Sequence, residues 1–215
     1  MTALPARARL EVLLRLIVAL LSLGAAAVHT FVIQSHFAEY WLFGVFFLVL
    51  ALLQAVWAVT LMVRPIRRLL IWGAVGNAIV VGLWLVTRTV GLPLGPEPGS
   101  PEAVGFIDGA ATAFEVLLVA GVWALLRPGL AGRSIPREFV PAGAIGAGVM
   151  IAMVTQDAVL SGHGTAEGID TSSILSGHVP HLILIGIAVA AFVGYVVVDV
   201  LRHGRPTFSK NARLR

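Results

Sequence analysis

Six long apolar runs divide the chain of 215 residues, and short segments rich in Arg, Gly and Pro separate them. A helix that crosses about 30 Å of hydrocarbon needs roughly 20 apolar residues. The runs are continuous rather than alternating, and backbone groups in lipid must be hydrogen-bonded within their own segment, so each run predicts a helix. We therefore expect an all-α polytopic membrane protein that forms a single domain over residues 1–215. The six spans are expected near residues 10–33, 40–62, 67–90, 106–126, 138–160 and 178–201.

The composition also indicates a membrane environment. The chain is 58% hydrophobic and 12% charged, with a mean hydropathy of +0.94, whereas about a quarter of the residues are charged in ordinary soluble domains. The pI near 10.6 does not indicate nucleic-acid binding, because the basic residues recur at the ends of apolar runs. We expect the lipid bilayer as the main partner, with a homo-oligomer or a larger membrane complex left open. The absence of cysteine excludes disulfides, thiolate metal sites and iron–sulfur clusters.

The basic residues predict how the chain is oriented. With six spans in place, all but one of the 15 Lys and Arg residues fall on one side, and Arg88 is the exception. Because cytoplasmic loops carry an excess of Lys and Arg, we expect both termini to be cytoplasmic in the cell membrane. The loops near 34–39, 91–105 and 161–177 then face outward. The first span has a long apolar core, so we expect an uncleaved helix rather than a signal peptide.

Most titratable side chains fall on the predicted outer side. Five of the 6 histidines and eight of the 11 carboxylates lie there, together with one arginine. This asymmetry predicts a surface that attracts cations. Without cysteine, a metal site on this side would use histidine and carboxylate ligands, and copper or zinc is the expected ion.

Two carboxylates predict a polar stripe in the fourth span. Glu115 comes about nine residues into that span, on the order of 13 Å along a helix, where a carboxylate must be neutralised, paired or coordinated. Asp108 is seven residues earlier and lies on nearly the same helix face. Arg88 is expected to pair with Asp108 or Glu115, and full pairing would remove one carboxylate from a metal site. A hydrogen-bonded contact between helices is the alternative role of this stripe.

Four histidines complete the predicted metal site. His29 and His36 are seven residues apart, so their rings share one face if the first helix continues through FVIQSH, and Glu39 follows three residues later. His178 and His181 fall in the first turn of the last span, where neutral imidazoles can share an ion although the positive helix N-terminus disfavours one. The predicted ligands are His29, His36, Glu39, Asp108, Glu115, His178 and His181.

Further polar residues take supporting places. Gln54 and Asn77 are deep in the second and third spans, where amides bond between helices or line a path. Asp157 lies at the outer end of the fifth span, close enough to the following LSGH segment to join it, and His163 is expected to face solvent or to capture an ion. Loop carboxylates such as Glu102 are expected to be solvated and receive no role.

The stretch WLVTRTVGLPLGPEPGSPEAVGFIDGAATAFE, residues 84–115, resembles a group of multi-pass membrane proteins of bacteria and archaea. The resemblance extends back through HTFVIQSHFAEYWLFGVFFLVLALLQAVWA, so it covers the first four spans. It implies that Arg88, the Gly/Pro loop, Asp108 and Glu115 form one unit. It assigns no activity and no catalytic residue.

Several functions fit this pattern. The leading interpretation is a transition-metal site near the outer face for metal handling, sensing or transport, with a proton-coupled carrier as a variant. A redox or monooxygenase-type subunit that holds copper or haem between transmembrane histidines is an alternative. A non-catalytic accessory subunit is another. A hydrolase with serines beside His163 and His178 is a further one, although the sequence has no G-x-S-x-G elbow. Whether the protein is an enzyme stays open.

Overall fold

The computed structural model describes residues 7–164. The chain divides into two compact units, Met1–Asp170 and Thr171–Arg215, and all described residues belong to the first. The predicted sixth span at 178–201, which includes His178 and His181, lies outside the described residues.

The first five predicted spans are present as helices. Each is long and apolar enough to cross a membrane. The described chain is therefore mostly helical, as predicted, and its apolar helices suggest a lipid bilayer as their surroundings. The helices are α1 (Leu10–Glu39), α2 (Trp41–Val63), α3 (Arg67–Thr89), α4 (Phe106–Leu125) and α6 (Phe139–Gly164), with a single turn, α5 (Pro128–Ala131), between α4 and α6.

Two helices extend beyond the predicted spans. α1 continues through FVIQSH to Glu39, six residues past the predicted end, because no Gly or Pro interrupts the chain after Gly24. It stops at Tyr40, whose backbone is extended (φ −158°). α6 runs to Gly164, so the loop expected from residue 161 begins later and His163 falls in the last turn of the helix.

A short pair of strands at one end of the bundle was not predicted from the sequence. β1 (Arg7–Arg9) pairs antiparallel with β2 (Ser134–Pro136), with Arg7 opposite Pro136. Strands of three residues are too short to show an alternating pattern, and their pairing joins segments that are far apart in the sequence. This pair ties the beginning of α1 to the segment that precedes α6.

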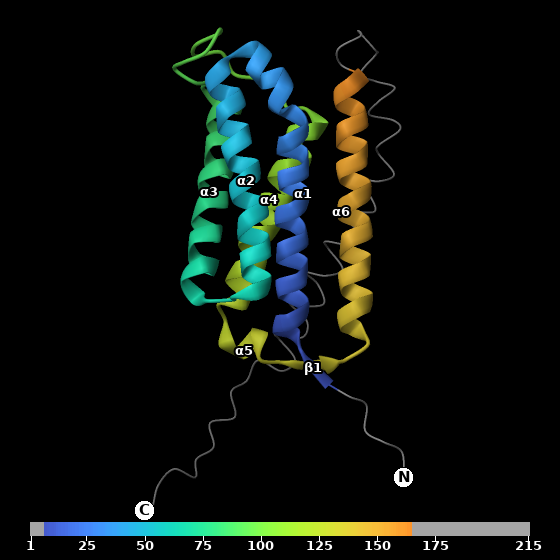
Figure 1. Cartoon of the computed structure of the whole chain (residues 1–215). Helices are drawn as coiled ribbons and strands as arrows, with labels where there is room; N and C mark the ends of the chain where they lie inside the picture. Colours follow the sequence, from blue (N-terminus) through green and yellow to red (C-terminus); the bar gives the residue numbers. More distant parts are fainter. Residues whose placement is uncertain (1–6, 165–215) are drawn as a thin grey trace, which may run out of the picture. The chain divides into compact units, whose positions relative to one another are not determined.

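The packing buries polar side chains and exposes apolar ones. α1 packs against α2, α4 and α6, and α3 packs against α4 (Figure 1). On α2, Leu53 and Val56 are 63% and 62% exposed, whereas Gln54 between them is buried. Soluble proteins rarely expose apolar surface of this extent. Apolar side chains outside and polar groups inside are the arrangement expected of helices that face lipid.

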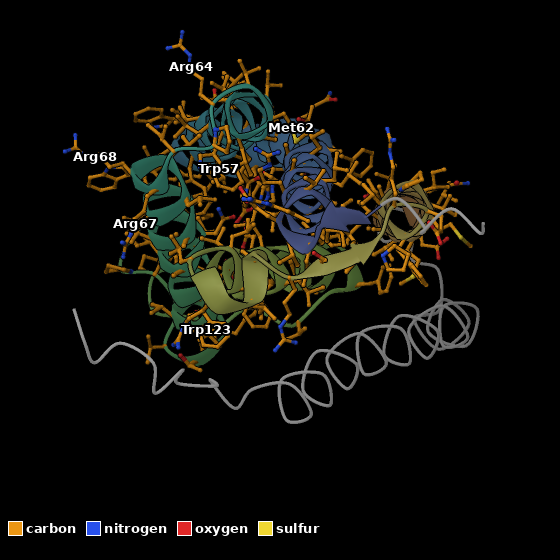
Figure 2. The ribbon with its side chains drawn as sticks, turned by 90° about the horizontal axis from the view of Figure 1, so that it is seen from below. Trp57, Met62, Arg64, Arg67, Arg68 and Trp123 are labelled. Atoms are coloured by element: carbon orange, nitrogen blue, oxygen red, sulfur yellow. The ribbon has the colours of Figure 1, made fainter. Side chains whose placement is uncertain are left out.

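The two ends of the bundle differ in charge. At one end, here called the basic end, lie the turn from α2 to α3, the strand pair and α5 (Figure 1). Figure 2, viewed from this end, shows Arg64 and Arg68 pointing outward and Trp57 pointing inward. At the other end, here called the cavity end, α1 joins α2 and a loop of residues 90–105 joins α3 to α4. Arg88 is the one arginine near this end within residues 7–164.

The loop at the cavity end depends on glycine. Gly91 has a φ of 72°, and a Cβ there would lie within 2.6 Å of the backbone of Gly99 and Ser100. Only glycine adopts a positive φ without strain and has no Cβ to collide with this backbone. Farther along the loop, the Glu102 amide donates to the Thr87 carbonyl at 2.9 Å. This hydrogen bond places Glu102 next to the end of α3.

Candidate functional site

A chain of buried polar side chains connects α1, α2, α3 and α4. Glu115 Oε1 accepts a hydrogen bond from Gln54 Nε2 at 3.0 Å and lies 3.0 Å from His29 Nε2. Gln54 Nε2 also lies 3.1 Å from Asn77 Oδ1, and Asn77 Nδ2 donates to the Gly73 carbonyl at 2.8 Å. Each of the four helices supplies one side chain. This chain of hydrogen bonds therefore fixes how the four helices are rotated relative to one another.

Burial explains why these four side chains meet. Glu115 is 1% exposed, and His29, Gln54 and Asn77 are all buried. A carboxylate in an apolar interior is costly unless it is paired and hydrogen-bonded. With Nε2 protonated, His29 donates to Glu115, so the carboxylate has two donors on one oxygen. The Ser22 hydroxyl on α1 donates a hydrogen bond to the backbone carbonyl of Gln54 at 2.8 Å, which fixes α1 against α2 beside the site.

A cavity of about 410 Å³ opens between α1, α2, α3 and α4 on the cavity-end side of this polar chain. Most of its wall is aliphatic or aromatic, and His29 and Glu115 are buried residues on it. The volume lies within the range of about 300–1,000 Å³ that is typical of ligand pockets. Its residues come from four helices and the 90–105 loop, including Phe43, Phe46, Phe47, Val80, Leu83 and Ile107.

An ion-pair cluster lines the more exposed part of the cavity. Arg88 Nη2 and Nε donate to Asp108 Oδ2 at 2.7 and 3.1 Å, and Arg88 Nη1 also contacts Glu102. Trp84 Nε1 donates to the same Asp108 oxygen at 2.9 Å, and the Arg88 guanidinium lies 5.8 Å from the centre of the Trp84 ring. The Arg88 guanidinium is therefore paired with two carboxylates and lies within cation–π distance of one aromatic ring.

The two histidines of α1 have different hydrogen bonds. His36 Nδ1 lies 2.8 Å from the Val32 carbonyl, and because a carbonyl can only accept, Nδ1 carries a hydrogen. The neutral ring then keeps Nε2 as an acceptor. Phe47 contacts both imidazoles, with ring centres 5.4 Å from His29 and 4.2 Å from His36. His36 lines the same cavity as His29, so one aromatic ring lies beside both histidines.

The other predicted site residues lie elsewhere. Glu39 lines a second hollow with Glu97 and Glu102, and not the main cavity. Asp157 is half-buried on α6 and does not line the main cavity. Within residues 7–164, no group of three His or carboxylate side chains could hold a metal ion. His178 and His181 lie outside the described residues, so the predicted metal or haem ligation through them stays a prediction.

Three residues of the site were not expected from the sequence. The sequence predicts that Glu102 is solvated; its side chain is 53% exposed, but it also pairs with Arg88. Trp84 and Ser22 have no predicted role. Trp84 is four residues before Arg88, and an aromatic residue at that helical spacing from a lone cation is a signal that could have found it.

Comparisons with known protein families, with curated proteins and with solved structures found no match.

Replacing Arg88 by glutamine is expected to lower the free energy of unfolding by about 1.5–3 kcal/mol, the range for hydrogen bonds to charged groups. Most of this loss comes from Asp108, because Glu102 is 53% exposed and its ion pair contributes little. Unfolding in detergent, followed by tryptophan fluorescence, measures the change. Arg68→Gln is the control because Arg68 is exposed at the basic end. Equal losses in the two variants would contradict the prediction.

Proposed function

We propose that this protein is an integral membrane protein that binds a small, largely apolar organic molecule in the cavity between α1, α2, α3 and α4. The polar group of the ligand lies at the His29–Glu115 pair. The observation that carries the proposal is a cavity of about 410 Å³ with mainly apolar walls that reaches this buried pair. Protein interiors contain few voids larger than a water molecule, so a cavity of this size that ends on polar groups is typical of a binding site.

The proposal includes six spans with both termini in the cytoplasm. The arginines gathered at the basic end support this orientation, since Lys and Arg are enriched in cytoplasmic loops. The cavity then opens toward the outer face of the cell membrane. A ligand would reach it from that side or from the outer half of the bilayer.

A pair of neighbouring substitutions on α3 tests the cavity. Val80 lines it, whereas Ile79 does not and is 65% exposed. Three benzyl compounds of similar shape serve as probes: benzyltrimethylammonium, neopentylbenzene and benzylsulfonate. We expect at least one to bind the wild type at one molecule per chain, Val80→Phe to lower its affinity at least tenfold, and Ile79→Phe to leave it unchanged.

Bound compound is measured by sedimenting proteoliposomes and quantifying the pellet by mass spectrometry, with protein-free vesicles subtracted. If none of the three compounds binds above the vesicle background, the proposed function is wrong. The same holds if Val80→Phe and Ile79→Phe bind the compounds equally well.

A transition-metal site is a second candidate function. It is favoured by the contact between His29 and Glu115, two of the predicted ligands, at 3.0 Å. A set of three or four ligands would require His178 or His181 in addition. Elemental analysis of the purified protein should then find one copper or zinc ion per chain, lost in His29→Ala and in His178→Ala but retained in His203→Ala. A wild type without bound metal after growth with added copper and zinc would refute this candidate.

A further inference from the structure

The ionisable side chains on the cavity wall favour a positive ligand. The wall contains one arginine and three carboxylates, in addition to two histidines. With neutral histidines the formal charge of the wall is −2, and it would still be negative if His29 were an imidazolium cation. A charged guest in an apolar cavity needs an opposite charge close by. The wall supplies this counter-charge for a cation and not for an anion.

The charges are unevenly distributed along the cavity. Arg88 is held by Asp108 and Glu102 in the more exposed part, so its charge is already compensated there. In the buried part, Glu115 is in contact with His29 and Gln54, and the described residues place no Lys or Arg on the wall there. An anionic group entering this part would meet the Glu115 carboxylate. A cationic group would find a single carboxylate with which to pair.

Aromatic side chains on the cavity wall reinforce the preference. Phe43, Phe46 and Phe47 of α2 all line the cavity, and Phe47 contacts the ring of His29. The face of an aromatic ring attracts a cation within about 6 Å, and the attraction is stronger where water is excluded. Aromatic rings together with one buried carboxylate are therefore suited to an ammonium group that carries an apolar body.

We infer that the cavity takes a lipophilic organic monocation, either a protonated amine or a quaternary ammonium ion, whose positive group lies against Glu115. This inference rests on the proposed function and specifies the class of ligand. The single buried carboxylate matches one positive charge. The apolar wall formed by α2, α3 and α4 matches the rest of the molecule.

The three benzyl probes differ in charge while sharing a ring and a compact branched group. Benzyltrimethylammonium is cationic, neopentylbenzene is its neutral isostere and benzylsulfonate is anionic. We expect the cation to bind wild-type proteoliposomes at least tenfold more tightly than the neutral isostere, and the anion to bind most weakly. The vesicles consist of zwitterionic phosphatidylcholine, so that lipid charge does not attract the cation.

Glu115→Gln tests the proposed anchor. Glutamine keeps an oxygen that can accept from Gln54, so the fold is preserved, and unchanged binding of the neutral isostere will show that the cavity is intact. We expect the preference for the cation over the neutral isostere to fall at least tenfold. Glu97→Gln removes an exposed carboxylate that does not line this cavity, and it should leave the preference unchanged.

The outcomes separate the two proposals. If the neutral compound or the anion binds at least as tightly as the cation, the inference is overturned and the proposed function stands. If the cation preference survives in Glu115→Gln, the assignment of its anchor is overturned. If none of the compounds binds the wild type, the proposed function fails and the inference fails with it.

Discussion

Replacing Glu115 by alanine should lower the free energy of unfolding by about 2–4 kcal/mol. Breaking a buried charged pair by removing one partner costs roughly 3–5 kcal/mol in soluble proteins, whereas hydrogen bonds between membrane helices average only about 0.6 kcal/mol. The expected value lies between these because Glu115 accepts from two helices at once. Its removal leaves His29 without this partner and leaves Gln54 only Asn77 as an acceptor for Nε2.

Glu115→Gln separates the loss of charge from the loss of hydrogen bonds. The amide oxygen can still accept from Gln54, so we expect this variant to lose about 1 kcal/mol or less. Unfolding is followed by circular dichroism in a single detergent, with Glu138→Gln as a control because Glu138 is exposed at the basic end. A Glu115→Ala variant within about 0.5 kcal/mol of the wild type, the usual range for surface substitutions, would show that the polar chain does not hold the helices together.

The helices could be predicted because lipid removes most alternatives. A continuous apolar run of 20 or more residues in a bilayer has no other way to satisfy its backbone than a helix, and the structure has helices at the first five predicted positions. The exact ends depend on local breakers and on contacts with the rest of the chain. α1 therefore extends to Glu39, because no Gly or Pro interrupts it. β1 forms by pairing with β2, a segment more than 100 residues away in the sequence.

The composition of the site could be predicted better than its contacts. Glu115, Gln54 and Asn77 stand out because a polar side chain deep in a span is costly, and His29 because it belongs to a spaced pair. Which side chain touches which depends on how each helix is rotated about its axis, and the sequence pattern does not determine that rotation. The cavity is a still less local property, because its volume is what four packed helices leave unfilled.

The partners of Arg88 illustrate the same limit. As the one cation on the acidic outer side, Arg88 is predicted to pair with Asp108 or Glu115, and the structure pairs it with Asp108 and Glu102. Glu102 lies in a loop rich in Gly and Pro, where a solvated charge is the ordinary expectation. Glu102 is indeed exposed, but the backbone hydrogen bond from Glu102 to Thr87 also brings it to Arg88, and a hydrogen bond of this kind has no signature in the sequence.

Gly73→Ala is expected to destabilise the protein by about 1–3 kcal/mol, the usual cost of overpacking a tight contact. A Cβ at Gly73 would overlap the indole of Trp57, which lies against α3 and donates from Nε1 to the Leu69 carbonyl at 2.8 Å. This hydrogen bond holds the half-buried ring against α3. The added methyl group therefore forces α2 and α3 apart or breaks the hydrogen bond.

Gly76 provides the matched control in the same helix, because a Cβ there would meet nothing within 4 Å. Gly76→Ala should leave stability unchanged or raise it by up to about 1 kcal/mol, since alanine favours a helix more than glycine does. Combining Gly73→Ala with Trp57→Ala removes the overlapping ring, so the added cost of the Cβ should largely disappear. Unfolding in one detergent, followed by circular dichroism, is measured for the wild type, the three single variants and the double variant. If Gly73→Ala costs as much in the Trp57→Ala background as in the wild type, the close approach of Trp57 does not explain why glycine stands at position 73.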